Sequence, residues 1–169
     1  MAERRLFFAL WPDDRQRETL RDALSPALAT VEGRRVDRRN WHVTLVFIGD
    51  FPEEQIPFLQ AAVGEIPVQP MRLRFDRLGY WPRAKVAALL PLNTPEAVQS
   101  LASALEESLR AFDIEPEDRL FRPHITVARR VRQFDTVPLA RPVDLEWKRF
   151  ELVESAPAAG GVRYQPLNQ

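Results

Sequence analysis

The sequence predicts an α+β domain whose two halves repeat one order of elements. A chain of 169 residues has the length of one ordinary domain and can bury roughly 70% of its extended-chain surface without disulfides or metal ions. In each half, an apolar run, a helix and a polar loop precede a strand that begins with histidine, an apolar residue and threonine. We therefore expect a single domain over residues 1–169, with internal halves of roughly 1–80 and 81–169.

The first half begins with a short apolar run at 5–11. Asp13 is a good N-terminal cap for a helix that reaches about residue 24, and Pro26 is expected to end or kink that helix. After a basic loop, the stretch WHVTLVFIGD predicts a strand over 41–48 that is closed by glycine and aspartate. A proline and two glutamates then open a second helix, 52–63.

The middle of the chain predicts two further strands and one strong helix. Alternating apolar residues favour strands at 71–78 and 86–92. Thr94 is the expected N-cap of the following helix, with Pro95 at the first helical position. The helix has a clear apolar stripe, which consists of Val98, Leu101, Leu105, Leu109 and Phe112.

Three strands are expected in the remainder of the chain. The second histidine motif predicts a strand over 120–128. Two closing strands, 143–154 and 162–167, flank a turn that contains Pro157 and a pair of glycines.

Both histidines of the chain start the same local pattern, HVTL at His42 and HITV at His124. Side chains alternate between the two faces of a strand, so His42 and Thr44 point the same way about 6.6 Å apart. His124 and Thr126 do the same. Because the motifs occupy related positions in the two halves, the strands can present these groups from opposite sides of a shared groove.

Two imidazoles and two hydroxyls in one groove suit in-line displacement at phosphorus. One histidine can take a proton from the attacking oxygen while the other gives a proton to the leaving oxygen. Thr44 and Thr126 would hydrogen-bond the non-bridging oxygens, and Arg129 could offset the charge that develops on them. Arg129 follows His124 by five residues, so only a bend at the end of the strand would aim it at the groove.

A zinc or di-metal hydrolase is the alternative chemistry. Such a site needs three or more ligands, whereas the acidic residues nearest the histidines, Asp37 and Asp118, lie in the preceding loops without ligand spacing. The chain has no cysteine, which removes thiolate nucleophiles and cysteine-based metal sites. We therefore expect neither a metal nor another cofactor.

The charged and aromatic residues give weaker indications. The 24 basic and 24 acidic residues balance, so no global charge favours nucleic acid. All basic residues but two are arginine, whose planar fork binds phosphate bidentately, although a codon bias explains this total equally well. Arginines flank both motifs at Arg34, Arg35, Arg38, Arg39, Arg129, Arg130 and Arg132. Trp41, Trp81 and Trp147 are candidates for stacking on a base, but aromatic residues beside strands more often belong to the core.

The start of the chain lacks the length and cleavage site of a signal peptide. No run approaches the roughly 20 apolar residues of a membrane span. We expect a cytoplasmic monomer that contacts no membrane.

At the level of motifs, the sequence resembles the 2H phosphoesterase superfamily, which is defined by two H-x-[TS]-x motifs. Within it, the phrases RLFFAL, NWHVTLVFIGD and FRPHITVAR are similar to those of the RNA 2′,3′-cyclic phosphodiesterases, also called 2′-5′ RNA ligases. The likeness covers nearly the whole chain. Trp41 departs from the family's pattern, in which a smaller aliphatic residue is common at this position. The preferred base of the substrate and the width of the groove therefore stay undecided.

The resemblance implies two pseudo-symmetric lobes with antiparallel sheets around a central cleft and helices on the outside. It implies hydrolysis of a terminal 2′,3′-cyclic phosphate to a 2′-phosphomonoester without a metal, and 2′,5′ ligation as a reverse activity. In it, His42 is the proton donor to the 3′ leaving oxygen and His124 the proton acceptor that activates water. Thr44, Thr126 and Arg129 bind the phosphate.

Two other functions stay open at this point. One is a module that binds RNA ends or nucleotides without turning them over. The other is an enzyme of the same chemistry that acts on a small cyclic nucleotide metabolite, which would share all of these motifs.

Overall fold

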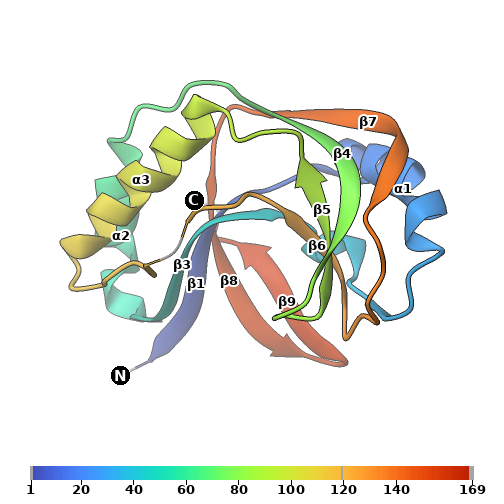
Figure 1. The fold of residues 1–169 in the computed structure, drawn as a ribbon. Coiled ribbons are helices and arrows are strands. Elements are labelled where there is room, and N and C mark those ends of the chain that lie inside the picture. The colour runs from blue at the N-terminus through green and yellow to red at the C-terminus, as the bar shows by residue number, and fades with distance from the viewer. Residues whose placement is uncertain (1, 119, 168–169) are drawn as a thin grey trace.

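The computed structural model describes residues 2–118 and 120–167, and in this range the chain forms two antiparallel sheets with three α-helices outside them (Figure 1). This confirms the expected α+β class with its two sheets. The first sheet has the strand order β3-β1-β8-β9 and the second has the order β2-β6-β5-β4-β7. Each sheet therefore combines strands from both halves of the chain.

The strands of the first sheet come from the two ends of the sequence. They are β1 (Glu3–Leu10), β3 (Val43–Pro52), β8 (Glu151–Ala158) and β9 (Gly161–Pro166). The second sheet is built from β2 (Arg34–Arg35), β4 (Met71–Trp81), β5 (Val86–Pro91), β6 (Ile125–Arg129) and β7 (Val137–Trp147). Helix α1 (Asp14–Leu28) packs on β7, and α3 (Glu96–Arg110) packs on both β3 and β4. In Figure 1, α3 and α2 (Ile56–Gly64) lie on the opposite side of the strands from α1.

The N-terminus of α1 follows the prediction, but its C-terminus does not. Asp13 accepts a hydrogen bond from the backbone N–H of Gln16, whose side chain accepts one from the N–H of Asp13, which is a complete capping box. The helix passes Pro26 and ends at Leu28. A proline this close to the end removes a single helical hydrogen bond, and the buried residue Ala27 keeps the last turn on the core.

The other two helices begin later than expected. A 3-10 turn, Glu53–Gln55, precedes α2, which begins at Ile56 with Pro57 in its first turn, where a missing N–H costs nothing. Pro95, rather than Thr94, is the N-cap of α3. The predicted apolar stripe of α3 is confirmed, since Val98, Leu101, Leu105 and Leu109 are all buried.

Three strand predictions are corrected. The expected strand over 143–154 is wrong, because β7 ends at Trp147 in the second sheet and β8 begins at Glu151 in the first. Strand β6 begins only at Ile125, after Pro123, which cannot donate to a ladder. Strand β3 continues through Gly49 to Pro52, and Gly49 has φ +90° at an irregularity in its pairing, where glycine is favoured.

Each histidine strand contains a β-bulge directly after its threonine. In the β1–β3 pairing, Ala9 is opposite Thr44 and Phe8 is opposite Val46, so Leu45 is an extra residue. In the β5–β6 pairing, Ala88 is opposite Thr126 and Ala87 is opposite Ala128. Val127 is therefore the corresponding extra residue of β6, and the residues after each bulge change face.

Candidate active site

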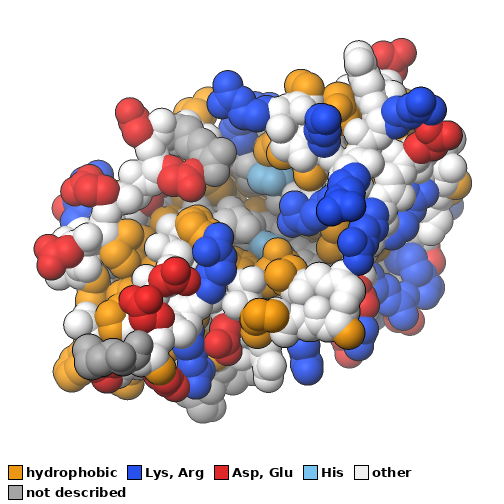
Figure 2. Space-filling model, turned by 90° about the horizontal axis from the view of Figure 1, so that it is seen from below, with side chains coloured by type: hydrophobic (Ala, Val, Ile, Leu, Met, Phe, Trp, Pro, Cys, Tyr) orange, Lys and Arg blue, Asp and Glu red, His pale blue; other side chains and the backbone are white. Residues whose placement is uncertain are grey.

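The two histidines lie in one hollow of the surface. His42 directly precedes β3 and His124 directly precedes β6, so each sheet contributes one imidazole. Figure 2 shows both histidine side chains at the bottom of this hollow. The groove predicted from the two motifs is present, and we call it the cleft.

The alternation predicted for each motif is also present. His42 and Thr44 are half-buried, whereas Val43 between them is fully buried. His124 and Thr126 are half-buried on either side of the fully buried Ile125. Each strand thus holds its apolar face in the core and presents one imidazole and one hydroxyl on the other face.

The two imidazoles are held by the same backbone contact. His42 Nδ1 lies 2.7 Å from the carbonyl oxygen of Asn40, and His124 Nδ1 lies 2.8 Å from that of Arg122. A carbonyl oxygen only accepts, so Nδ1 of each ring carries a hydrogen and donates it. The proton chemistry of each ring is thereby assigned to Nε2, and Nε2 of His42 lies 2.9 Å from Thr44 Oγ1.

Aromatic rings surround His42. The ring centroids of Phe7, Tyr164 and Trp11 lie 4.8, 5.1 and 5.9 Å from the centroid of His42. These residues belong to a small apolar cluster that is separate from the main core. The pKa of His42 is lowered to about 4, chiefly by burial and also by the charges of His124, Arg129 and Arg17, against a backbone hydrogen bond with Asn40 that raises it.

The ring of Trp81 packs against His124. The His124 ring lies 4.1 Å from the ring of Trp81, and the guanidinium of Arg122 lies 4.7 Å from that ring. Trp81 therefore contacts the imidazole of His124 and a guanidinium cation, the latter in a cation–π geometry. Of the three tryptophans considered as stacking candidates, Trp81 is the one whose ring contacts a histidine ring.

Trp41 and Trp147 belong to the core, as is usual for aromatic residues beside strands, and not to the groove. Trp41 is only 5% exposed, and Trp147 is equally buried, both within the main core. Neither ring can stack on a ligand without unfolding the core around it. Trp11, which the sequence did not single out, is instead stacked on His42 at an interplanar angle of 20°.

Arg129 lies on the cleft side because of the bulge at Val127. In a regular strand, Arg129 would point away from Thr126, but the extra residue reverses the alternation after it. Val127 and Ala128 are both buried and Arg129 is exposed. The lowering of the pKa of His42 by the charge of Arg129 agrees with this placement.

Asn40 is a site residue to which the sequence reasoning gave no role. Its side-chain amide donates to the carbonyl oxygen of Val162 at 3.0 Å and accepts from the N–H of Tyr164 at 3.1 Å. Its own carbonyl oxygen orients His42. Asn40 therefore ties the first histidine to strand β9, and its position two residues before the histidine was the available signal.

The arginines before the first motif have largely local roles. Arg35 donates to the carbonyl oxygens of Val31 and Leu28 at the end of α1, and Arg39 forms a bidentate pair with Asp37. Arg34 donates to the carbonyl oxygen of Gly160 in the β8–β9 turn. This hydrogen bond connects the second sheet, which contains β2, to the first. Arg38 is exposed beside them.

Among residues 2–118 and 120–167, no group of three or more histidine, cysteine or acidic side chains is placed to hold a metal ion. Within the same residues, none of the helices has the length and apolar character needed to cross a membrane.

Comparisons with known proteins agree with the geometry. Residues 10–88 match the family described as LigT like Phosphoesterase. The chain is 30% identical over 169 residues to the RNA 2′,3′-cyclic phosphodiesterase of Escherichia coli (strain K12), with 98% of this chain and 94% of that protein covered. It is 32% identical over 181 residues to the protein of the same name from Thermus thermophilus, covering 98% and 88% of the two chains.

The fold is shared as well. The crystal structure of E. coli LigT complexed with 3′-AMP has a TM-score of 0.87 at 29% identity, with 99% of this chain and 97% of that chain covered. Together with the paired H-x-T motifs in one cleft, these matches show that the chain belongs to the LigT-like phosphoesterases of the 2H superfamily.

Proposed function

We propose that this protein hydrolyses the terminal 2′,3′-cyclic phosphate of RNA to a 2′-phosphomonoester, with two histidines as the acid and the base. The observation that carries the proposal is the matched pair of imidazoles in one cleft, each with Nδ1 donating to a backbone carbonyl, which assigns proton transfer to Nε2. The E. coli and T. thermophilus relatives bear the name of this activity.

In the proposed reaction, His124 Nε2 takes a proton from water as the water oxygen attacks phosphorus. The bond from phosphorus to the 3′ oxygen breaks, and protonated His42 gives its Nε2 proton to that oxygen. The hydroxyls of Thr44 and Thr126 and the guanidinium of Arg129 stabilise the charge on the non-bridging oxygens. With a 5′-hydroxyl in place of water, the same steps join two RNA ends through a 2′,5′ linkage.

The role of His42 as the acid requires the substrate to raise its pKa. Burial is the main cause that lowers the pKa of His42 to about 4, so the ring is mostly neutral at pH 7. A bound phosphate anion favours the charged imidazolium, and Thr44 Oγ1, which lies 2.9 Å from Nε2, can then turn toward the phosphate. We propose that the substrate thereby recruits the acid that cleaves it.

The direct test is incubation of EDTA-treated protein with an RNA that ends in a 2′,3′-cyclic phosphate, followed by assignment of the product. We expect a 2′-phosphate, and losses of roughly 10² to 10⁴ in turnover for His42→Ala and for His124→Ala. A 3′-phosphate would reverse the leaving-group assignment. Saturable binding without any product would favour a binding module instead.

All residues of the proposed mechanism come from one chain, which supports action as a monomer. We place this activity in the cytoplasm, where RNA ends are available. An enzyme for a small cyclic nucleotide metabolite would have the same two histidines. Comparing kcat/KM on a cyclic mononucleotide with kcat/KM on an RNA that ends in a cyclic phosphate separates the two.

A further inference from the structure

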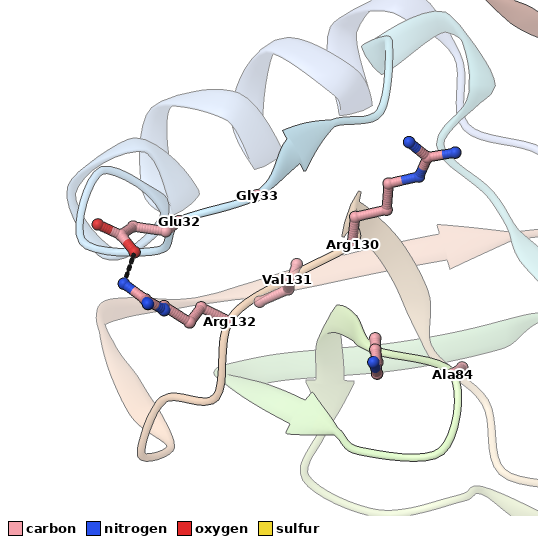
Figure 3. Close-up of a pocket in the computed structure, with 7 residues that line it drawn as sticks. Glu32, Gly33, Ala84, Arg130, Val131 and Arg132 are labelled. Carbon is pink, nitrogen blue, oxygen red and sulfur yellow. Dashed lines mark hydrogen bonds and ion pairs between the residues drawn. The ribbon is translucent and has the colours of Figure 1, made fainter.

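A second hollow lies beyond the end of β6, outside the histidine machinery. It has a volume of about 580 Å³ and is lined by Glu32, Gly33, Ala84, Lys85, Arg130, Val131 and Arg132. Figure 3 shows Glu32 and Arg132 joined by an ion pair on one side and Arg130 on the other, its guanidinium directed away from that pair. We call this place the Lys85–Arg130 hollow.

The charge of this hollow is positive and uncompensated. The ion pair of Glu32 and Arg132, at 3.2 Å, neutralises its one acidic lining residue. Lys85 and Arg130 are exposed, and neither forms an ion pair with any residue that the structure describes. Two cations without an acidic partner, beside a hollow of this size, are suited to an anionic ligand.

Two positively charged residues also lie opposite each other on neighbouring strands next to this hollow. Arg34 of β2 is directly opposite Arg129 of β6 in the sheet. Directly opposite like charges on neighbouring strands are unfavourable, and arrangements that a fold would avoid for its own stability are typical of functional surfaces. A bound polyanion removes this repulsion.

The backbone holds both cations in an uncommon conformation. Lys85 has φ 57° and Arg130 has φ 53°, in the left-handed region that residues with side chains seldom adopt. The N–H of Val131 donates to the carbonyl oxygen of Lys85 at 2.9 Å, which ties the β4–β5 turn to the end of β6. The two cations are therefore displayed from one connected piece of backbone, at positions where strain often accompanies function.

The hollow lies beyond the end of the strand that carries Thr126. Arg130 is four residues beyond Thr126, so its Cα lies at most about 13 Å from that of the proposed phosphate binder, and less where the bulge at Val127 and the left-handed backbone of Arg130 shorten the chain. Figure 2 shows Lys and Arg side chains gathered beside the hollow that holds the histidines. A ligand that reaches both places must extend well beyond one phosphate group.

We propose that Lys85 and Arg130 bind the phosphodiester backbone of an RNA strand upstream of its cyclic-phosphate terminus. This rests on the proposed function, and it names an oligoribonucleotide, rather than a free cyclic mononucleotide, as the preferred substrate. Single-strand sites of this kind combine a cationic track with aromatic side chains, and Trp81, at the other end of the β4–β5 turn, is the aromatic residue at hand.

The test compares one substrate of each size. The value of kcat/KM is measured for 2′,3′-cyclic AMP and for a five-residue RNA ending in a 2′,3′-cyclic phosphate, with wild-type protein, Lys85→Asn, Arg130→Asn and the double variant. Asparagine is chosen because it tolerates the left-handed conformation. Arg141→Asn, which removes an exposed arginine of β7, is the matched control.

We expect the double variant to lose about tenfold or more in kcat/KM on the RNA while its value on cyclic AMP stays unchanged. The slope of log(kcat/KM) against log salt should also flatten by about 0.7 for each phosphate contact removed. Arg141→Asn should match wild type on both substrates. Equal losses on both substrates, or no loss on the RNA, would overturn the proposal.

Binding separates this proposal from the proposed function. The dissociation constant of a fluorescent five-residue RNA with a 3′-phosphate is measured by anisotropy for the same variants, a readout that needs no turnover. If wild-type protein hydrolyses neither substrate, the proposed function fails, and the hollow is still judged by whether the double variant binds this RNA at least about tenfold more weakly. Unchanged binding would reject the hollow as an RNA site.

Discussion

The imidazole of His42 has a lowered pKa because it is packed among three aromatic rings, those of Phe7, Trp11 and Tyr164, and because the charges of His124, Arg129 and Arg17 lie nearby. In the unfolded chain its pKa would be near 6.5, so between about pH 6.5 and pH 4 the unfolded state binds a proton that the folded state does not. Protonation in this window therefore favours unfolding.

A pH series of stability measurements tests this. The free energy of unfolding should fall as the pH is lowered from about 6.5 to 4, with a contribution from His42 on the order of 3 kcal/mol at most. His42→Gln should lack that part of the fall, as measured by urea unfolding at each pH. Asp37, whose pKa is lowered to about 2 by its hydrogen bonds to Arg39, adds to the lower end of this fall because its carboxyl binds a proton more readily in the unfolded chain, but it does so equally in wild type and variant. A parallel pH dependence in wild type and variant would contradict the placement of His42.

The same residue gives a prediction for ligand binding. Inorganic phosphate near Nε2 should raise the pKa of His42 from about 4, since an anion stabilises the imidazolium. Nuclear magnetic resonance titration of the histidine ring signals, with and without phosphate, measures this directly. A His42 pKa that phosphate leaves unchanged would argue against His42 as the proton donor.

Among the helices and strands, the sequence predicted most of what depends on local periodicity. The two H-x-T motifs were correctly placed with histidine and threonine on one face, because a two-residue period is visible in the residues themselves. The apolar stripe of α3 was predicted for the same reason. The burial of Trp41 was the favoured interpretation, but the sequence could not separate it from Trp81, whose ring lies beside His124, because the neighbours of each ring come from other strands.

Features that arise from pairing between strands could not be predicted. The bulge at Val127 exists only relative to β5, so the sequence alone left Arg129 on the wrong face unless the strand bent. The boundary between β7 and β8 was missed because strand-like residues lie on both sides of it, and the change from one sheet to the other within the short connection is visible only in the pairing of the strands. Asn40 received no role because its partners, Val162 and Tyr164, are more than 120 residues away in the chain.

The hydrogen bonds between the Asn40 side chain and strand β9 can be tested by mutation. Asn40→Ala keeps the backbone carbonyl that holds His42 but removes both side-chain hydrogen bonds to β9, so His42 should be less well oriented. We expect a loss of about tenfold in kcat with little change in KM, and a less defined tautomer in the nitrogen spectrum of the His42 ring. Asn40→Asp keeps the acceptor for the Tyr164 N–H and should recover part of kcat. If Asn40→Ala retains the wild-type kcat and tautomer, the side chain is not a positioning group.

In the molecule as a whole, α3 joins the two lobes, since it packs on β3 of the first sheet and on β4 of the second. Leu105 lies on its buried face and has no solvent exposure. Leu105→Ala should lower the free energy of unfolding by about 2–5 kcal/mol, as measured by urea denaturation. Because no residue of α3 takes part in the cleft chemistry, kcat of the folded protein should change less than twofold. Ser103→Ala, at an exposed position of the same helix, is the control and should be near neutral.

The exchange of strands between the halves has a consequence for how the protein is made. Strand β1 pairs with β3 and also with β8, and Asn40 and His42 reach partners in β9. During synthesis, the first histidine therefore emerges long before the segment that completes its surroundings. The amino-terminal half must remain without a finished sheet until β8 and β9 have left the ribosome, and a chain cut short before β8 would contain a complete first motif but no formed cleft.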